Sequence, residues 1–455
     1  MVVNNYYDVT KWPAGNPYED IGEVINSILA DIKSRQRDID RNEGGKPGAV
    51  IYIPSGDYHL VTQVVIDISY LKILGSGHGF TSSSIRFNTP ESEWADWHEV
   101  WPGGSRILVD IPAAHDNEES AGAAFYIQRD GNPRISSVEF EGFCIDGLHF
   151  VNYGTGSGNP ENTYVNGKTG IYAASANDSF RITGMGMIYL EHGITMYHAD
   201  ALSIHDNFIA ECGNCIELRG WGQASKITNN LIGAGYRGHS IYAQKFAGLL
   251  VAANNVFPRG AGSVYFEHVA RSSITGNRLH SFYPGMIILE GNCSENLIAS
   301  NHLLRDHEPW PPMQMHDNGL DDLYGLVQIN GSYNSVMANH ISEVIERQFI
   351  QPEGAKPVMI HVVSGKGNYI SNNHIVASAG EAEQPDAETD SCFARQVDAL
   401  LTVKELEELE VITVLVEKEA VQNTVLDTGR EEQVILDKTA NAFRPAPAIG
   451  VISDF

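Results

Sequence analysis

Two acidic residues, Asp206 and Glu217, have a spacing that would suit catalysis by a pair of carboxylates. Asp206 lies directly before the asparagine of the string IHDNFI (204–209), and Glu217 follows shortly after it in CIEL (215–218). Cleavage of a glycosidic bond uses two carboxyl groups roughly 5–10 Å apart, one of which protonates the departing oxygen. The spacing alone also fits two unrelated surface acids, because the chain holds 57 acidic residues.

The string around Asp206 belongs to a repeat with a near-constant period. Its asparagine recurs within similar short strings that contain β-branched residues, at Asn207, Asn230, Asn254, Asn277 and Asn301. Later copies occupy 336–341 and 370–375, after longer insertions. A unit of about 23 residues, with short apolar strands and Asn or Gly at the corners, is typical of a solenoid coil. The regular intervals disfavour the alternative, an ordinary sandwich with accidental spacing.

The repeat also shows that the two acids are unusual for their positions. It aligns Asn229, Ala253 and Gly276 with Asp206, and Tyr242 with Glu217. Acidic residues therefore occupy both positions in this coil and not in the coils aligned after it. Two carboxylates on the surface of one coil are expected to come within the distance that glycosidic chemistry needs.

We predict an all-β protein, a right-handed parallel β-helix of the pectin-lyase-like kind over residues 46–376. Residues 1–45 are expected to form an N-terminal segment whose amphipathic helix, within 18–39, caps the first coil and covers its sheet edges. Its apolar residues have helical spacing, at Ile21, Val24, Ile25, Ile28, Leu29 and Ile32. Residues 377–455 are expected to form C-terminal coils with an acidic, partly helical insertion, and 379–410 is either a solvated appendage or a lid over a cleft.

Composition and charge narrow the classes of function. With 30 basic and 57 acidic residues, the net charge is −27, which disfavours nucleic acid and polyanionic sugars as partners. No stretch approaches the roughly 20 apolar residues of a membrane span. The first twenty residues contain no apolar segment typical of a signal peptide. If Met1 is the native start, we expect a cytoplasmic protein; if a leader has been trimmed, we expect a secreted one.

We interpret the cysteines and two of the histidines as structural residues. Five cysteines, an odd and widely spaced set, do not form a disulfide framework; they are Cys144, Cys212, Cys215, Cys293 and Cys392. Cys212 and Cys215 form a CxxC, which we interpret as two packed thiols in preference to a zinc or redox site. His192 and His205 are expected to be hydrogen-bonded structural residues.

Several strings together resemble glycoside hydrolase family 91, the inulin fructotransferases and difructose anhydride hydrolases. They are NGKTGI (166–171), DSFRITGMG (178–186), YLEH (189–192), NFIAECGNCIEL (207–218), NNVFPRG (254–260), FYPGM (282–286) and NGLDDLYG (318–325). The resemblance implies a homotrimer of β-helices with active sites at the subunit interfaces. It also implies a catalytic Asp and Glu at the positions of Asp206 and Glu217, with no metal or organic cofactor.

The resemblance leaves three functions open. The favoured one is a difructose anhydride III hydrolase, which opens the cyclic dianhydride to linear difructose. The alternative is an inulin fructotransferase that releases difructose anhydride III, or I, from inulin ends. A remote third is a β-helix that binds carbohydrate without catalysis. In the enzymes, we expect Glu217 to be the general acid, with a pKa raised by partial burial, and Asp206 to be the base, a stabilising carboxylate or a nucleophile.

Overall fold

The computed structural model divides the chain into two compact units, which are described separately. Unit 1 comprises 1–150 and 162–232, unit 2 comprises 151–161 and 233–455, and the division falls inside one strand, β22 (Leu231–Ala234). Within these units the structure describes residues 5–35, 48–79, 92–93, 103–112, 119–131, 134–148, 166–234, 238–257, 263–281, 284–306, 325–345, 358–379, 412–428, 434–436 and 441–443.

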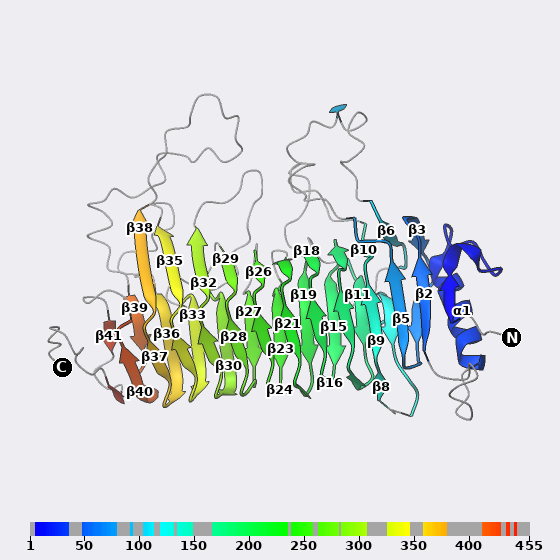
Figure 1. Ribbon diagram of the computed structural model, residues 1–455. Coiled ribbons are helices and arrows are strands. Elements are labelled where there is room, and N and C mark those ends of the chain that lie inside the picture. Colours follow the sequence, from blue (N-terminus) through cyan, green and yellow to red (C-terminus); the bar gives the residue numbers. More distant parts are fainter. Residues whose placement is uncertain are drawn as a thin grey trace. The chain divides into compact units, whose positions relative to one another are not determined.

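Unit 1 is built from coils whose strands stack in parallel into three long sheets, A, B and C, and one short sheet (Figure 1). Sheet A holds β1 (Tyr6–Asp8), β2 (Ala49–Ile53), β5 (Leu71–Gly75), β9 (Val138–Glu141), β13 (Arg181–Thr183), β17 (Ser203–His205) and β21 (Lys226–Thr228). Sheet B holds β3 (Gly56–Leu60), β6 (Ser105–Val109), β10 (Cys144–Asp146), β14 (Gly186–Ile188), β18 (Phe208–Cys212) and β22. Sheet C holds β4 (Val64–Ile66), β7 (Ala123–Ile127), β11 (Thr169–Ala173), β15 (His192–Tyr197) and β19 (Asn214–Arg219). The short sheet holds β8 (Ile135–Ser136), β12 (Asn177–Asp178), β16 (Ala199–Asp200) and β20 (Gly222–Gln223).

Unit 2 repeats the same arrangement of three sheets. Its sheet A holds β25 (Leu250–Ala252), β28 (Ser273–Thr275), β31 (Leu297–Ala299), β34 (Ser335–Met337), β37 (Tyr369–Ser371), β40 (Ala420–Leu426) and β42 (Asn441–Phe443). Its sheet B holds β26 (Asn255–Val256), β29 (Arg278–Ser281), β32 (His302–Asp306), β35 (His340–Ile345) and β38 (His374–Ala379). Its sheet C holds β23 (Ile241–Gln244), β27 (Val264–Glu267), β30 (Ile287–Ser294), β33 (Val327–Ser332), β36 (Val358–Lys366), β39 (Ile412–Val416) and β41 (Val434–Leu436), and β24 (Phe246–Ala247) is a short strand. The predicted fold, a right-handed parallel β-helix, is confirmed.

Identical apolar residues stack from coil to coil because the strands pair in register. In sheet A of unit 1, Ile182 pairs with Ile204 and Ile204 with Ile227, and all three are fully buried. Burying each such side chain contributes roughly 1.5–3 kcal/mol. The period of the sequence repeat is therefore the length of one coil, and a one-residue slip of a strand's register would move these side chains out of the core.

The corner asparagines tie each coil to the next. In unit 1, Asn207 Nδ2 donates both to the Ile182 carbonyl (3.0 Å) and to Asn230 Oδ1 (2.9 Å). In unit 2 the same ladder runs through Asn254, Asn277, Asn301, Asn339 and Asn373. The residue before each asparagine takes a left-handed backbone conformation, as at Asp206 (φ 57°) and Asn229 (φ 58°).

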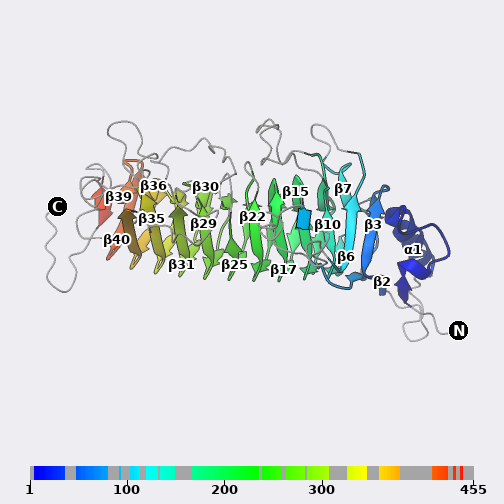
Figure 2. The ribbon, with the colours of Figure 1, turned by 90° about the horizontal axis from the view of Figure 1, so that it is seen from above.

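The predicted N-terminal helix is α1 (Ile21–Arg35), preceded by the 3-10 turn η1 (Val9–Lys11). Its six apolar residues named above are all buried, and it packs against β2, β3 and β4 of the first coil. Figure 2 shows α1 beside β2 and β3 at the end of unit 1. Asp20 caps its start, because its Oδ1 accepts from the backbone N–H of Gly22 (3.0 Å). Within the described residues, no helix is both long and apolar enough to cross a lipid bilayer.

The insertion and the boundary of the predicted C-terminal region lie mostly outside the described residues. Ala379 ends β38, and residues 380–410, the rest of the proposed lid, are not described. After the insertion, the predicted C-terminal coils include the strand β39 (Ile412–Val416). The predicted boundaries at 45/46 and 376/377 stay predictions.

The CxxC cysteines are packed thiols, as predicted. Cys212 and Cys215 are fully buried thiols, like Cys144 and Cys293. Burial raises the pKa of each of Cys144, Cys215 and Cys293, in the last case to about 11. A thiol needs both exposure and ionisation to react with an electrophile.

We therefore expect these four thiols to be inert in the folded protein. In a Cys392→Ser background, a disulfide-exchange reagent such as dithionitrobenzoate should label none of them in buffer and all four after unfolding in guanidinium. Rapid labelling of the folded protein would contradict the packed interpretation.

Candidate active site

Asp206 lies at the corner where sheets A and B of unit 1 meet. It is placed between β17 and β18, in the left-handed conformation that the corner requires. Its side chain is 58% exposed, and its Oδ2 lies 2.7 Å from His205 Nδ1. The same His205 nitrogen lies 3.3 Å from Thr183 Oγ1 on the preceding coil.

Glu217 lies on the outer face of sheet C. Its neighbours Ile216 and Leu218 point into the core, so the alternation of β19 turns Glu217 outward, in register with Thr195 of β15. An outward residue is normally exposed, yet Glu217 is only 3% exposed. It is therefore covered by other polar side chains.

The structure does not bring the two predicted residues together within one chain. Asp206 precedes the whole of β18, which at about 3.3 Å per residue is roughly 17 Å long, and the coil then turns a further corner before β19. Asp206 stands at the corner between sheets A and B, whereas Glu217 faces outward from sheet C. The expectation that they meet on one coil, within reach of one glycosidic bond, is wrong within a single chain.

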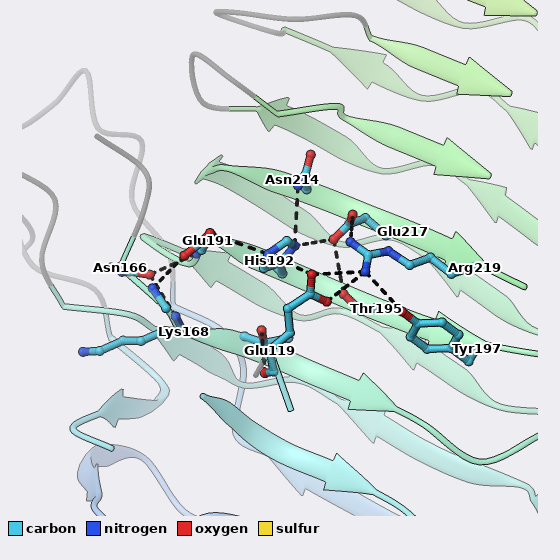
Figure 3. Close-up of polar contacts among 12 residues, drawn as sticks. Glu119, Asn166, Lys168, Glu191, His192, Thr195, Tyr197, Asn214, Glu217 and Arg219 are labelled. Carbon is cyan, nitrogen blue, oxygen red and sulfur yellow. Dashed lines mark hydrogen bonds and ion pairs between the residues drawn. The ribbon is translucent and has the colours of Figure 1, made fainter. Parts of the chain in front are cut away.

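Three side chains, from β15 and β19, contact the carboxylate of Glu217 (Figure 3). Its Oε2 lies 2.5 Å from His192 Nδ1 and accepts from Thr195 Oγ1 at 3.3 Å. Its Oε1 accepts from Arg219 Nη2 at 2.6 Å. Arg219 Nη1 also donates to both oxygens of Glu119, at 3.1 and 2.9 Å, so Glu119 closes the cluster from a segment 100 residues away.

A short segment before β11 supports the histidine end of the cluster. The Gly167 N–H donates to Glu191 Oε2 (2.7 Å), and Asn166 Oδ1 accepts from the Glu191 N–H (3.1 Å). Lys168 points away from the carboxylates, because its Nζ donates to the carbonyls of Val109 (2.6 Å) and Gly147 (2.8 Å). Glu191 is thereby held beside His192, which Figure 3 shows between it and Glu217.

The charge state of Glu217 is opposite to the one expected for a general acid. Burial alone would raise its pKa, but the hydrogen bonds and charges of His192 and Arg219 outweigh burial and lower the pKa. In the same pair, burial opposes ionisation of His192, and Glu217, Glu119 and Glu191 together raise the pKa of the imidazole. The predicted raised pKa of Glu217 is therefore wrong, because the prediction considered burial without its partners.

The arrangement thus combines Glu217, whose pKa is lowered, an imidazole whose pKa is raised, and a guanidinium, all on the covered outer face of a sheet. Tyr197 and Tyr172 lie beside it, with ring centroids 5.8 Å apart, and Tyr197 OH accepts from Arg219 Nη1 (3.2 Å). Paired carboxylates and aromatic faces of this kind suit a neutral sugar. In the described part of the chain, no three His, Cys, Asp or Glu side chains gather as metal ligands.

Sequence reasoning missed most of this cluster. Glu191 and His192 belong to the string YLEH, and Asn166 and Lys168 to NGKTGI, so two quoted motifs did mark the region. Arg219 lies two residues beyond Glu217, and an alternating strand would have placed it on the same face. Glu119 lies outside the recognisable repeats, and no spacing indicates it.

Comparisons with protein-family models agree with the fold. Residues 300–447 match the family described as the β-helix repeat of inulin fructotransferase. Residues 126–310 match the family described as periplasmic copper-binding protein NosD.

Comparisons with individual proteins are more specific. The chain is 43% identical over 395 residues to an inulin fructotransferase (DFA-I-forming) of Arthrobacter globiformis, covering 85% of this chain and 93% of that protein. It is 62% identical to a DFA-IIIase of Arthrobacter chlorophenolicus A6 solved in complex with DFA-III, with TM-score 0.87 and 98% and 99% of the two chains covered. The same DFA-IIIase without its lid, in complex with GF2, is 60% identical with TM-score 0.85, covering 98% and 100%. By these similarities, over nearly its whole length, the chain belongs to glycoside hydrolase family 91, the inulin fructotransferases and difructose anhydride hydrolases.

Proposed function

We propose that this protein is a difructose anhydride III hydrolase, which adds water across one bridge of the cyclic dianhydride and releases linear difructose. The observation that carries the proposal is its 62% identity, over 98% of the chain, to a DFA-IIIase that binds DFA-III. The buried charged cluster around Glu217 supplies chemistry suited to that reaction. No cofactor enters the proposal.

The reaction passes through an oxocarbenium-like state at an anomeric carbon. Water attacks that carbon and loses a proton to a base, while the departing oxygen receives a proton. Glu217, ionised between His192 and Arg219, places negative charge where the oxocarbenium develops, and such preorganised charge stabilises a transition state strongly in a covered site. Asp206 is proposed as the base, because its exposed carboxylate is open to water.

These two roles require Asp206 and Glu217 to face one substrate, and within one protomer they lie on different faces. We therefore propose that a neighbouring protomer supplies Asp206, in a homotrimer whose active sites lie at the subunit interfaces. A heterologous interface in a closed ring presents one surface of each chain to a different surface of the next. The corner that carries Asp206 and the face of sheet C that carries Glu217 are two such surfaces.

A second candidate is inulin fructotransferase, favoured by the 43% identity to a DFA-I-forming enzyme. In that reaction a fructose hydroxyl takes the place of water and the inulin chain is expelled. A β-helix that only binds carbohydrate is a remote third candidate, which the charged cluster around Glu217 disfavours.

One experiment separates the three functions. The purified protein is incubated in EDTA-containing buffer with difructose anhydride III and, separately, with inulin, and the products are resolved by chromatography. We expect linear difructose from the anhydride. Release of an anhydride from inulin as the faster reaction would identify a fructotransferase, and unchanged substrates would favour the binding protein.

A further inference from the structure

His192 is the first residue of β15 and lies among three carboxylates. Its Nδ1 contacts Glu217 Oε2 at 2.5 Å, and Asn214 Nδ2 lies 3.5 Å from the same nitrogen. Its Nε2 lies 3.8 Å from an oxygen of Glu119 and 3.8 Å from an oxygen of Glu191. The side chain is 10% exposed, so these carboxylates, and not solvent, determine its charge.

Glu217 is badly placed to donate a proton. Its Oε1 already accepts from Arg219, and its Oε2 faces His192 and Thr195, so each oxygen is directed at a donor. With His192 as the imidazolium, a protonated carboxyl would turn its own O–H toward one of these donors and lose a charge-assisted hydrogen bond. Chemistry at this carboxylate is therefore that of an anion.

His192, in contrast, has one N–H that is not committed among the described residues. A distance of 3.8 Å from Nε2 to the carboxylates of Glu119 and Glu191 is too long for a hydrogen bond. An oxygen of a bound sugar that entered between Nε2 and these carboxylates would find a donor there. The other nitrogen, Nδ1, is fixed by Glu217, which sets the orientation of the ring.

We infer that His192, as an imidazolium, donates the proton to the departing sugar oxygen, and that Glu217 is the anion that holds this imidazolium in place. The inference rests on the proposed function. The bond between the anomeric carbon and the bridging oxygen breaks, and that oxygen takes the proton from His192 Nε2. Water forms the new bond and gives its proton to the base, from which solvent returns a proton to His192. Atoms and charge balance, and no oxidant, reductant or metal is required.

The charges that face His192 favour this role. Glu217 of β19, Glu119 of the segment before β7 and Glu191 of its own strand region all raise the pKa of His192, against the opposing effect of burial. The guanidinium of Arg219 is engaged by Glu217 and Glu119. A raised pKa favours the imidazolium form, and kcat should fall as the pH rises through that pKa.

The test is the pH profile of kcat on difructose anhydride III for the parent, His192→Gln and Glu217→Gln. His192→Gln should lower kcat by about 10²–10⁴, leave KM within a few-fold, and abolish the alkaline fall of kcat. In Glu217→Gln the alkaline fall should remain but move to lower pH, because the imidazolium loses its anion. His59→Gln is the matched control, since His59 also pairs with a carboxylate, Asp110, at an exposed position of unit 1.

The reverse pattern would overturn the inference. If Glu217 itself is the acid, the alkaline fall disappears in Glu217→Gln and persists in His192→Gln. A kcat for His192→Gln within tenfold of the parent's would also overturn the inference. Circular dichroism and melting of each variant check folding, and His192→Asn replaces a variant that does not fold.

A measurement independent of turnover separates failure of this inference from failure of the proposed function. Nitrogen-15 NMR of histidine-labelled protein, with His192→Gln to assign the signal, should show His192 as an imidazolium at pH 7. A neutral ring at that pH refutes the inference whatever the substrate. An inactive parent with an imidazolium at His192 would refute the proposed reaction instead.

Discussion

Glu217→Gln and Asp206→Asn are each expected to lower kcat on difructose anhydride III by about 10²–10⁴, with the fold intact. Glutamine at 217 keeps a carbonyl oxygen for Arg219 but removes the negative charge that faces His192 and the developing oxocarbenium. Asparagine at 206 keeps the shape of the corner residue, and asparagine tolerates the left-handed conformation found there (φ 57°). Loss of activity would thus report chemistry and not misfolding.

Two control variants match these substitutions. Glu267→Gln removes an outward carboxylate from sheet C of unit 2, where Tyr242 and Gln244 donate to it. Asp178→Asn removes a half-buried carboxyl from the short sheet of unit 1. Both should stay within a few-fold of the parent in kcat, and a kcat of Asp206→Asn or Glu217→Gln within tenfold of the parent would end the assignment of that residue.

Mixing the two inactive variants tests whether neighbouring protomers share a site. In a cyclic trimer whose sites combine Asp206 of one chain with Glu217 of the next, every mixed trimer contains one intact pair. Co-refolding equal amounts of Asp206→Asn and Glu217→Gln should therefore restore about a quarter of the parent's active sites. If both residues acted within one chain, no mixture would recover activity.

The repeat made the fold predictable because stacking demands the same residue type at the same place in successive coils. The core holds Ile182, Ile204 and Ile227 in register, and the corner ladder holds Asn207 and Asn230. Both residue types therefore recur in the sequence with the period of one coil. Helix α1 was predictable for a similar reason, since its buried face repeats at the helical spacing.

The geometry of the site could not be read in the same way. The short spacing between Asp206 and Glu217 in the sequence does not indicate that the chain runs along β18 and turns a corner between them. The period locates residues along a coil, whereas a surface shared by two chains, as proposed here, would leave no periodic signal in the sequence. The charge of Glu217 depends on Arg219, His192 and Glu119, and the last of these comes from outside the repeat. Burial of one residue is predictable from pattern, but the partners that reverse its effect on a pKa are not.

The buried ion pair of Arg305 and Glu343 leads to the second large effect, on stability. The two residues are paired in register on β32 and β35 of unit 2, and their side chains are 1% and 0% exposed. Arg305 Nε lies 2.7 and 2.8 Å from the two oxygens of Glu343, and Nη2 lies 2.5 Å from one of them. Glu343→Ala would leave a guanidinium buried without this partner, and removing one member of a buried pair typically costs about 3–5 kcal/mol.

An exposed Arg–Glu ion pair in the same unit serves as the control for the effect of burial on stability. Arg271 Nε lies 3.0 Å from Glu295 Oε2, again between neighbouring coils, but these side chains are 73% and 53% exposed. Glu295→Ala should therefore change the free energy of unfolding by less than about 1 kcal/mol. Urea unfolding followed by far-ultraviolet circular dichroism measures both variants against the parent. Equal midpoints for Glu343→Ala and Glu295→Ala would contradict the argument, because only Glu343→Ala leaves a cation where water cannot replace its lost partner.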